Sequence, residues 1–233
     1  MSIKLSIIVP CYNEAGNIPL IVKKFSELLV EGIEVLLVDN GSTDDSAQVF
    51  ANELQNSQGI KLVKVKENKG YGYGILAGLK EAQGEVLAWT HADMQTDPAD
   101  VIAAYNKYLD ADDINTFVKG ARKERKLIEA FFSFGMQILA SIVLKTPLEE
   151  INAQPKLFSR GFYESYLKQG APDDFSLDLY ALYHAYRNCK IITVPVYFNK
   201  RIHGEAKGGG SWSGRIKLIR RTVAYIFELA KAI

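Results

Sequence analysis

The stretch HADMQTDP, residues 91–98, gathers polar side chains one residue after the apolar run VLAW. In an extended chain alternate residues point the same way, so His91, Asp93 and Gln95 are expected to face one side. Asp and Gln offer oxygen ligands suited to Mg²⁺ or Mn²⁺, and His suits Mn²⁺ or softer ions. Three such ligands leave coordination positions that a diphosphate would fill. The stretch therefore predicts a metal site, whereas Asp97 is expected only to cap the helix that begins at Pro98.

A glycine-rich stretch, NKGYGYG at residues 68–74, precedes a helical pattern. Its backbone amides, with Lys69 and Gly70, could contact a phosphate, but its spacing is neither that of a Walker loop nor that of a Rossmann loop. A close helix–strand contact explains the glycines equally well. The sequence leaves both readings open.

Charged residues elsewhere could complete an anion site. Asp39 ends the apolar run IEVLLVD, where its carboxylate could accept hydrogen bonds from a base or a ribose. Arg122, Arg201 and Lys207 fall in expected loops of the second half, where surface charge is the ordinary explanation. Arg201 and Lys207 flank glycines in a loop that could close, which makes anion binding an equal alternative there.

Alternating strand-like and helix-like patterns must position these residues. Strands are expected at 5–10, 33–39, 61–67, 85–90, 114–122, 155–160 and 190–198. Helices are expected at 16–30, 42–54, 75–83, 127–144, 173–188 and 215–233, and a further helix is expected to begin at residue 98. Ser42 or Thr43 is expected to cap the second of them. This alternation predicts an α/β fold with a mainly parallel central sheet flanked by helices. The polar groups after the first, second and fourth strands should then converge at one sheet edge.

Composition narrows the class of protein. The 233 residues suit one large domain or a domain with an appendage, and the net charge of +1 gives no signal for nucleic acid. Two cysteines and the lack of a signal-peptide pattern favour a reducing, cytoplasmic location. Residues 127–144 are apolar but interrupted by Glu129 and Gln137, which favours a buried helix over one lying on a membrane surface.

Several motifs occur together in order, and they carry a family resemblance. IIVPCYNEAGNI, VDNGSTDDS, NKGYGYGILAGL and HADMQTDP resemble those of the family 2 glycosyltransferases with the GT-A fold. Within that family, the pattern is similar to dolichol-phosphate mannose synthases and related polyprenyl-phosphate glycosyltransferases. The resemblance spans the chain and is strongest in the first 120 residues. It implies one domain over 1–233, with a nucleotide-sugar-binding half at 1–120 and an acceptor-binding half at 121–233 that ends in an amphipathic helix.

The resemblance also implies roles for particular residues. The family's base and ribose contacts match Pro10, Tyr12, Glu14 and Asp39, and its Asp-x-Asp metal motif matches His91 and Asp93, with Gln95 as a further ligand. Its phosphate contacts match Arg201 and Lys207. An acidic position of its acceptor side matches Asp178. This chain departs from the family at His91, where the family has a carboxylate. The ion held would be Mn²⁺ or Mg²⁺.

The implied reaction is inverting transfer from a nucleoside-diphosphate sugar to a polyprenyl phosphate or a glycan, in envelope polysaccharide or glycolipid synthesis. A phosphate acceptor needs no general base, whereas a hydroxyl acceptor would use Asp174 or Asp178. The basic final helix could dock on an anionic bilayer at the inner face of the cytoplasmic membrane, pack on the domain, or join a second subunit. A nucleotidyltransferase and a non-catalytic nucleotide-sugar-binding module with a degenerate metal site are the alternatives.

Overall fold

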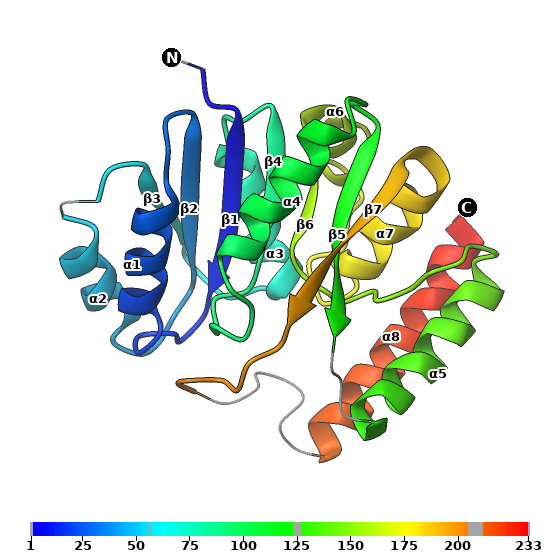
Figure 1. The fold of residues 1–233 in the computed structure, drawn as a ribbon. Helices are drawn as coiled ribbons and strands as arrows, with labels where there is room; N and C mark the ends of the chain where they lie inside the picture. Colours follow the sequence, from blue (N-terminus) through cyan, green and yellow to red (C-terminus); the bar gives the residue numbers. More distant parts are fainter. Residues whose placement is uncertain (1, 56, 124–126, 205–211, 233) are drawn as a thin grey trace.

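The computed structural model describes residues 2–55, 57–123, 127–204 and 212–232 (Figure 1). Within these ranges, seven strands form one sheet in the order β3-β2-β1-β4-β6-β5-β7. The strands are β1 (Leu5–Cys11), β2 (Ile33–Asn40), β3 (Ile60–Val65), β4 (Val86–Trp89), β5 (Thr116–Lys123), β6 (Lys156–Ser159) and β7 (Lys190–Tyr197).

The sheet is mainly parallel, as the alternating pattern predicted. Strands β1, β2, β3 and β4 run parallel, as do β5 and β7, whereas β6 is antiparallel to both of its neighbours, β4 and β5. Strands β2 and β3 follow on one side of β1, and the next strand in the sequence, β4, pairs with the other side of β1. Ligands of open α/β sheets bind beside such a reversal, at the carboxyl ends of the strands.

Helices cover both faces of the sheet (Figure 1). Helices α1 (Ile18–Leu28), α2 (Ser46–Glu53) and α4 (Ala99–Asp110) bury apolar residues with Leu5, Ile7 and Val9 of β1. Helices α3 (Tyr71–Glu81), α5 (Leu127–Val143), α7 (Leu177–Asn188) and α8 (Trp212–Ala232), with the short α6 (Arg160–Phe162) and η1 (Tyr163–Leu167), contribute to the other core, which includes Ile8. Alternate residues of β1 thus enter opposite cores, as the two-residue strand period requires.

Helix α2 starts later than the sequence predicted. Its first residue is Ser46, whose backbone amide donates to Asp44 Oδ1 at 3.0 Å. The expected caps are occupied elsewhere, because Ser42 Oγ accepts the Asn13 amide at 3.0 Å and Thr43 donates its own amide to Asn13 Oδ1 at 2.7 Å. The prediction of Ser42 or Thr43 as the cap is therefore wrong. Both residues instead hold the loop that follows β1.

The last helix packs along α5 (Figure 1). Ile226 of α8 is fully buried, whereas Ile216 and Ile219 remain 47% and 39% exposed. On α5, Ala140 is buried and Ile142 is exposed. The pair therefore buries one side in the core and leaves apolar side chains outside. No helix within the described residues is long and apolar enough to cross a membrane.

Candidate functional site

A pocket of about 390 Å³ opens at the carboxyl ends of β1, β2 and β4. The residues lining it are Pro10, Cys11, Tyr12, Glu14, Asn40, Asn68, Gly70, Tyr71, His91, Ala92, Asp93, Phe175, Arg201 and Leu218. The three polar groups that follow these strands in the sequence thus meet at one cavity. Two later segments, one with Phe175 and one with Arg201, close its sides.

Arg201 joins two of the residues expected to bind metal. Its Nη2 atom lies 2.6 Å from Asp93 Oδ2 and 3.2 Å from Gln95 Oε1. The backbone here is a turn with Met94 at a φ of 56°, so the extended geometry expected for residues 91–95 is wrong. The turn is held by a local bond, because the backbone N–H of Gln95 donates to Asp93 Oδ1 at 3.1 Å. A carboxylate oxygen and an amide oxygen therefore converge on one guanidinium nitrogen.

His91 lies in the same pocket as Asp93 and is half-buried. Burial lowers the pKa of its imidazole, although the charges of Asp93 and Asp178 act in the opposite direction. A lowered pKa favours the neutral ring, which is the form that can ligate a metal. Among the described residues, no group of three or more His, Cys, Asp or Glu side chains is placed to hold an ion by itself. An ion at Asp93 would need the Gln95 amide, His91 or ligand oxygens to complete its shell.

The part of the pocket that follows β1 contains three of the predicted residues, Pro10, Tyr12 and Glu14. Asp39 is buried at the end of β2, where its Oδ1 accepts the Ser42 amide at 3.0 Å. The next residue, Asn40, also lines the pocket. Its Nδ2 donates to the Gly70 carbonyl at 2.9 Å, while its buried Oδ1 has no hydrogen-bond partner among the described residues.

The glycine-rich stretch is shaped by packing. Helix α3 begins at Tyr71, inside the expected loop, and Lys69 lies over the Tyr73 ring at 5.3 Å. A Cβ on Gly70 would meet the Asp173 carbonyl oxygen at 2.4 Å, and one on Gly72 would meet the Pro172 carbonyl oxygen at 2.5 Å. The glycines therefore let this turn lie directly against the segment 172–174. Gly70 also lines the pocket, so the loop retains one position from which to contact a ligand.

This contact predicts a large effect for a small substitution. Gly72→Ala is expected to destabilise the fold by about 1–3 kcal/mol, because the added methyl group would collide with rigid backbone. The free energy of unfolding in urea measures the change. Gly135→Ala is the matched control, since it also lies in a helix but its Cβ would meet nothing within 4 Å. Equal stability of the two variants would contradict the packing argument.

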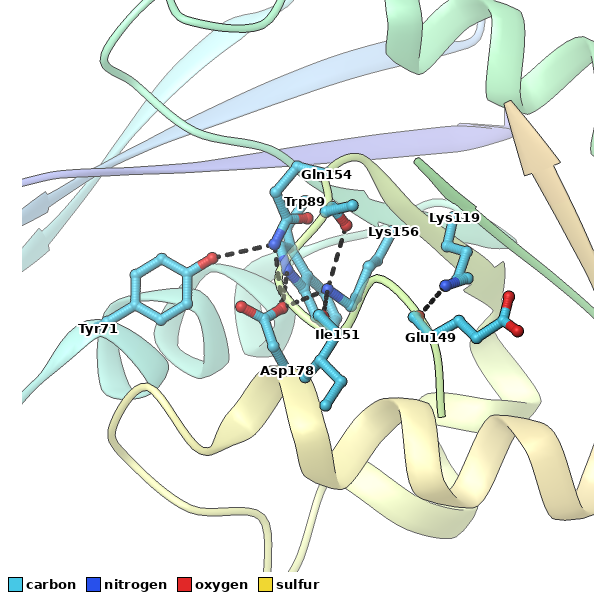
Figure 2. Close-up of polar contacts among 9 residues, drawn as sticks. Tyr71, Trp89, Lys119, Glu149, Ile151, Gln154, Lys156 and Asp178 are labelled. Carbon is cyan, nitrogen blue, oxygen red and sulfur yellow. Dashed lines mark hydrogen bonds and ion pairs between the residues drawn. The ribbon is translucent and has the colours of Figure 1, made fainter. Parts of the chain in front are cut away.

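The two carboxylates considered as general bases are both ion-paired. Asp178 is 2% exposed and lies 2.6 Å from the Nζ atom of Lys156, behind the residues that line the pocket (Figure 2). Asp174 lies beside the pocket residue Phe175, and its Oδ2 is 2.5 Å from Nε of Arg221 on α8. Asp174 directly precedes a pocket residue in the sequence, whereas the neighbours of Asp178 in the sequence do not line the pocket. A role for either carboxylate as a general base stays a prediction.

Other expected contacts lie away from the pocket lining or outside the structure. Arg122 pairs with Glu150 at 2.7 Å and packs on the Phe198 ring at 5.5 Å. Lys207 lies outside the described residues. Asp97 does act as a cap, because its Oδ1 accepts the Ala99 amide at 3.0 Å at the start of α4.

Tyr71 and Phe175 form an aromatic wall that was not predicted from the sequence. The rings of Tyr71 and Phe175 stack with centroids 5.0 Å apart and planes 8° from parallel, and Tyr71 also approaches His91 at 6.0 Å. Both stacked residues line the pocket, and Leu218 of α8 adds an apolar side chain. The stretch NKGYGYG drew attention for its glycines, and nothing in the spacing linked Tyr71 to a phenylalanine about a hundred residues later.

Comparisons with curated proteins give partial matches. An undecaprenyl-phosphate 4-deoxy-4-formamido-L-arabinose transferase of Yersinia enterocolitica is 34% identical over 104 residues, which cover 42% of this chain and 31% of that protein. The protein of the same description from Enterobacter sp. strain 638 is 33% identical over 103 residues, again covering 42% and 31%. These matches extend over about a third of the relatives' length.

Solved structures match over nearly the whole chain. Glucosyl-3-phosphoglycerate synthase from Mycobacterium tuberculosis, solved with Mn²⁺, uridine diphosphate and glucosyl-3-phosphoglycerate, superposes with a TM-score of 0.72 at 17% identity. The match covers 99% of this chain and 80% of that one. Residues 1–349 of TarS from S. aureus match with a TM-score of 0.60 at 18% identity, covering 96% and 65%. These neighbours support the expected GT-A fold.

The sequence pattern of the family described as "Glycosyl transferase family 2" matches residues 6–151, more than half of the chain. That span contains the strands β1, β2 and β4, whose carboxyl ends form the pocket. The chain belongs to glycosyl transferase family 2.

Proposed function

We propose that the chain transfers a sugar from a nucleoside-diphosphate sugar to a polyprenyl phosphate, with inversion at the anomeric carbon. The observation that carries the proposal is the convergence of Arg201, Asp93 and Gln95 in a pocket at the sheet's carboxyl edge. A guanidinium next to a carboxylate–amide pair can bind a diphosphate directly and through a divalent ion. The two undecaprenyl-phosphate transferases among the relatives support the class of acceptor.

In this reaction the chain's own residues mainly bind and orient. Pro10, Tyr12, Glu14 and the Asn40 amide surround the nucleoside end, and Arg201 contacts the diphosphate. An acceptor phosphate oxygen attacks the anomeric carbon as the bond to the diphosphate oxygen breaks, and the nucleoside diphosphate leaves. Asp93 and Gln95, with His91, would hold a Mn²⁺ or Mg²⁺ ion, which supplies positive charge for the leaving group. Phosphate acceptors are ionised at pH 7 and need no general base.

The proposal is tested first by binding and then by turnover. Thermal-shift measurements with UDP, GDP, CDP and dTDP, each with Mn²⁺, Mg²⁺ or EDTA, are expected to show one nucleotide that stabilises the protein only with metal. The sugar nucleotide of that base is then assayed with undecaprenyl phosphate and with a glycan hydroxyl acceptor. Stabilisation without turnover on any acceptor would favour a non-catalytic binding module, and no stabilisation would refute the proposal.

We further propose that α8 binds anionic membrane surfaces. Lys217 and Arg220 are exposed next to the exposed Ile216 and Ile219, so basic and apolar side chains occupy the same outer turn. Such a surface joins apolar insertion to attraction by anionic lipids. The double variant Lys217→Glu/Arg220→Glu is expected to bind vesicles containing phosphatidylglycerol at least about 30-fold more weakly, since each basic residue contributes about 1 kcal/mol. Vesicle flotation measures the change.

The control makes the same change of net charge on a different helix, α1. Lys23→Glu/Lys24→Glu alters two exposed lysines of α1, which packs on the opposite face of the sheet. Equal loss of binding in both double variants would show only a general charge effect. A dimer detected by light scattering, lost in the α8 variant, would assign this surface to a second subunit.

A further inference from the structure

A buried polar cluster adjoins Tyr71, one of the two residues of the aromatic wall (Figure 2). Asp178 Oδ1 accepts three hydrogen bonds: from Lys156 Nζ at 2.6 Å, from Gln154 Nε2 at 3.0 Å and from Trp89 Nε1 at 3.3 Å. The Lys156 ammonium also donates to the carbonyls of Ile151 at 2.8 Å and of Ala153 at 3.3 Å. All three donors of the ammonium therefore have acceptors, and the charge is fixed in one position.

The cluster reaches the pocket through Tyr71. Gln154 Nε2, which bonds Asp178, also donates to the Tyr71 hydroxyl at 3.2 Å. Burial raises the pKa of Tyr71 well above its usual value, and the negative charge of Asp178 adds to the shift. Tyr71 thus presents a neutral hydroxyl to the cluster and its ring to the pocket. The stack with Phe175 continues the wall from this fixed ring.

Stability alone explains this arrangement poorly. Lys156 is 0% exposed and Asp178 is 2% exposed, so both charges have lost their hydration. A buried ion pair gains little over well-packed apolar residues of similar volume, and replacement of the whole pair is often neutral or stabilising. What the pair supplies is a defined geometry, because it joins β6, α7 and the first residue of α3 at one point.

We propose that Lys156 is a positioning residue for sugar transfer: by fixing Asp178, and through Gln154 the Tyr71 hydroxyl, it holds the Tyr71–Phe175 wall at the distance from His91 and Asp93 that the reacting groups require. The inference rests on the proposed function and adds a role for residues outside the pocket lining. In this proposal the ion-paired Asp178 fixes the position of the Tyr71–Phe175 wall through Gln154.

The test separates position from stability. The double variant Lys156→Met/Asp178→Leu leaves no buried charge unpaired and is expected to fold. Its melting temperature is expected to be somewhat lower than that of the wild type, because the Trp89 and Gln154 donors lose their acceptor. Its kcat is expected to fall about 100-fold, with KM for the sugar nucleotide changed less than about threefold, because small misplacements slow chemistry more than binding. A folded double variant with wild-type kcat would overturn the inference.

A neighbouring lysine provides the matched control. Lys119 of β5 is directly opposite Lys156 in the sheet register and is 1% exposed, but its ammonium donates to the Glu149 carbonyl instead of to Asp178 (Figure 2). Lys119→Met therefore removes a buried ammonium without touching the link to Tyr71. It is expected to keep wild-type kcat, and an equal loss in both variants would show that any buried lysine here matters only for folding.

Two further measurements keep the inference decidable. If the double variant does not fold, Tyr71→Phe deletes only the hydroxyl, and it is expected to lower kcat about 10-fold at unchanged KM; unchanged kcat there would overturn the inference. If the wild type transfers no sugar, the proposed function fails. Amide hydrogen exchange over residues 68–76 then decides, with faster exchange expected in the double variant and not in Lys119→Met. Equal exchange would overturn the positioning role.

Discussion

Replacing Asp93 by alanine is expected to lower kcat/KM for sugar transfer by at least about 1000-fold, because it removes the carboxylate that holds both the proposed metal ion and Arg201. The substitution deletes one ligand of the ion and leaves the guanidinium without its anionic partner. Metal-dependent stabilisation by the nucleotide is expected to disappear as well. Steady-state kinetics and thermal shift with Mn²⁺ measure the two effects.

The control for this variant lies in the same turn. Asp97 is exposed and bonds the Ala99 amide at the start of α4, so Asp97→Ala is expected to cost about 1 kcal/mol of stability and little activity. Turnover by Asp93→Ala at the wild-type rate would refute the proposed site. Comparable losses for Asp93 and Asp97 would point instead to disruption of the whole turn.

Arg201→Ala is expected to change metal binding and turnover in opposite directions. In the structure Arg201 Nη2 contacts Asp93 Oδ2 and Gln95 Oε1, so a divalent ion that takes these two oxygens as ligands would have to displace the guanidinium. Its removal is expected to tighten Mn²⁺ binding to the nucleotide-free protein by about tenfold, because the pair is partly buried and weakly screened. Turnover is expected to fall about 100- to 1000-fold, since the leaving diphosphate loses a cation.

Calorimetry of Mn²⁺ binding without nucleotide isolates the first effect from catalysis. Lys200→Ala changes the neighbouring exposed cation and is expected to leave both properties near wild type. Weaker Mn²⁺ binding in Arg201→Ala would mean that Arg201 supports the ion site, and the competition argument would then fail.

The sequence predicted the architecture and the edge of the sheet that carries the pocket. Both follow from local patterns: apolar β-branched runs define β1, β2 and β4, and parallel strands bring the residues after them together. Asp93 was recognisable because its neighbours are local. The helix cap at Ser42 was mispredicted because a tertiary contact with Asn13 competes for that hydroxyl.

The parts that the sequence could not give depend on distant partners. The sequence around Asp178 does not indicate its ion pair with Lys156, and the sequence around Tyr71 does not indicate its stack on Phe175. The first pair joins β6 to α7 and the second joins α3 to the segment before α7, so both follow from the packing of whole elements. An acidic residue in a helix therefore looked like a general base, while in the structure it lies in a buried ion pair.

The position of β6 has a consequence for how the chain acquires its structure. Within the described residues, β5 and β7 connect to the other strands of the sheet through β6, which pairs with β4 on one side and β5 on the other. On a ribosome, the edge of β4 would therefore stay unpaired until residue 159 has emerged, and an unpaired edge invites aggregation. A fragment that ends at residue 151, where the family pattern ends, would lack this strand. The segment that carries the family motifs is thus expected to be unable to fold on its own.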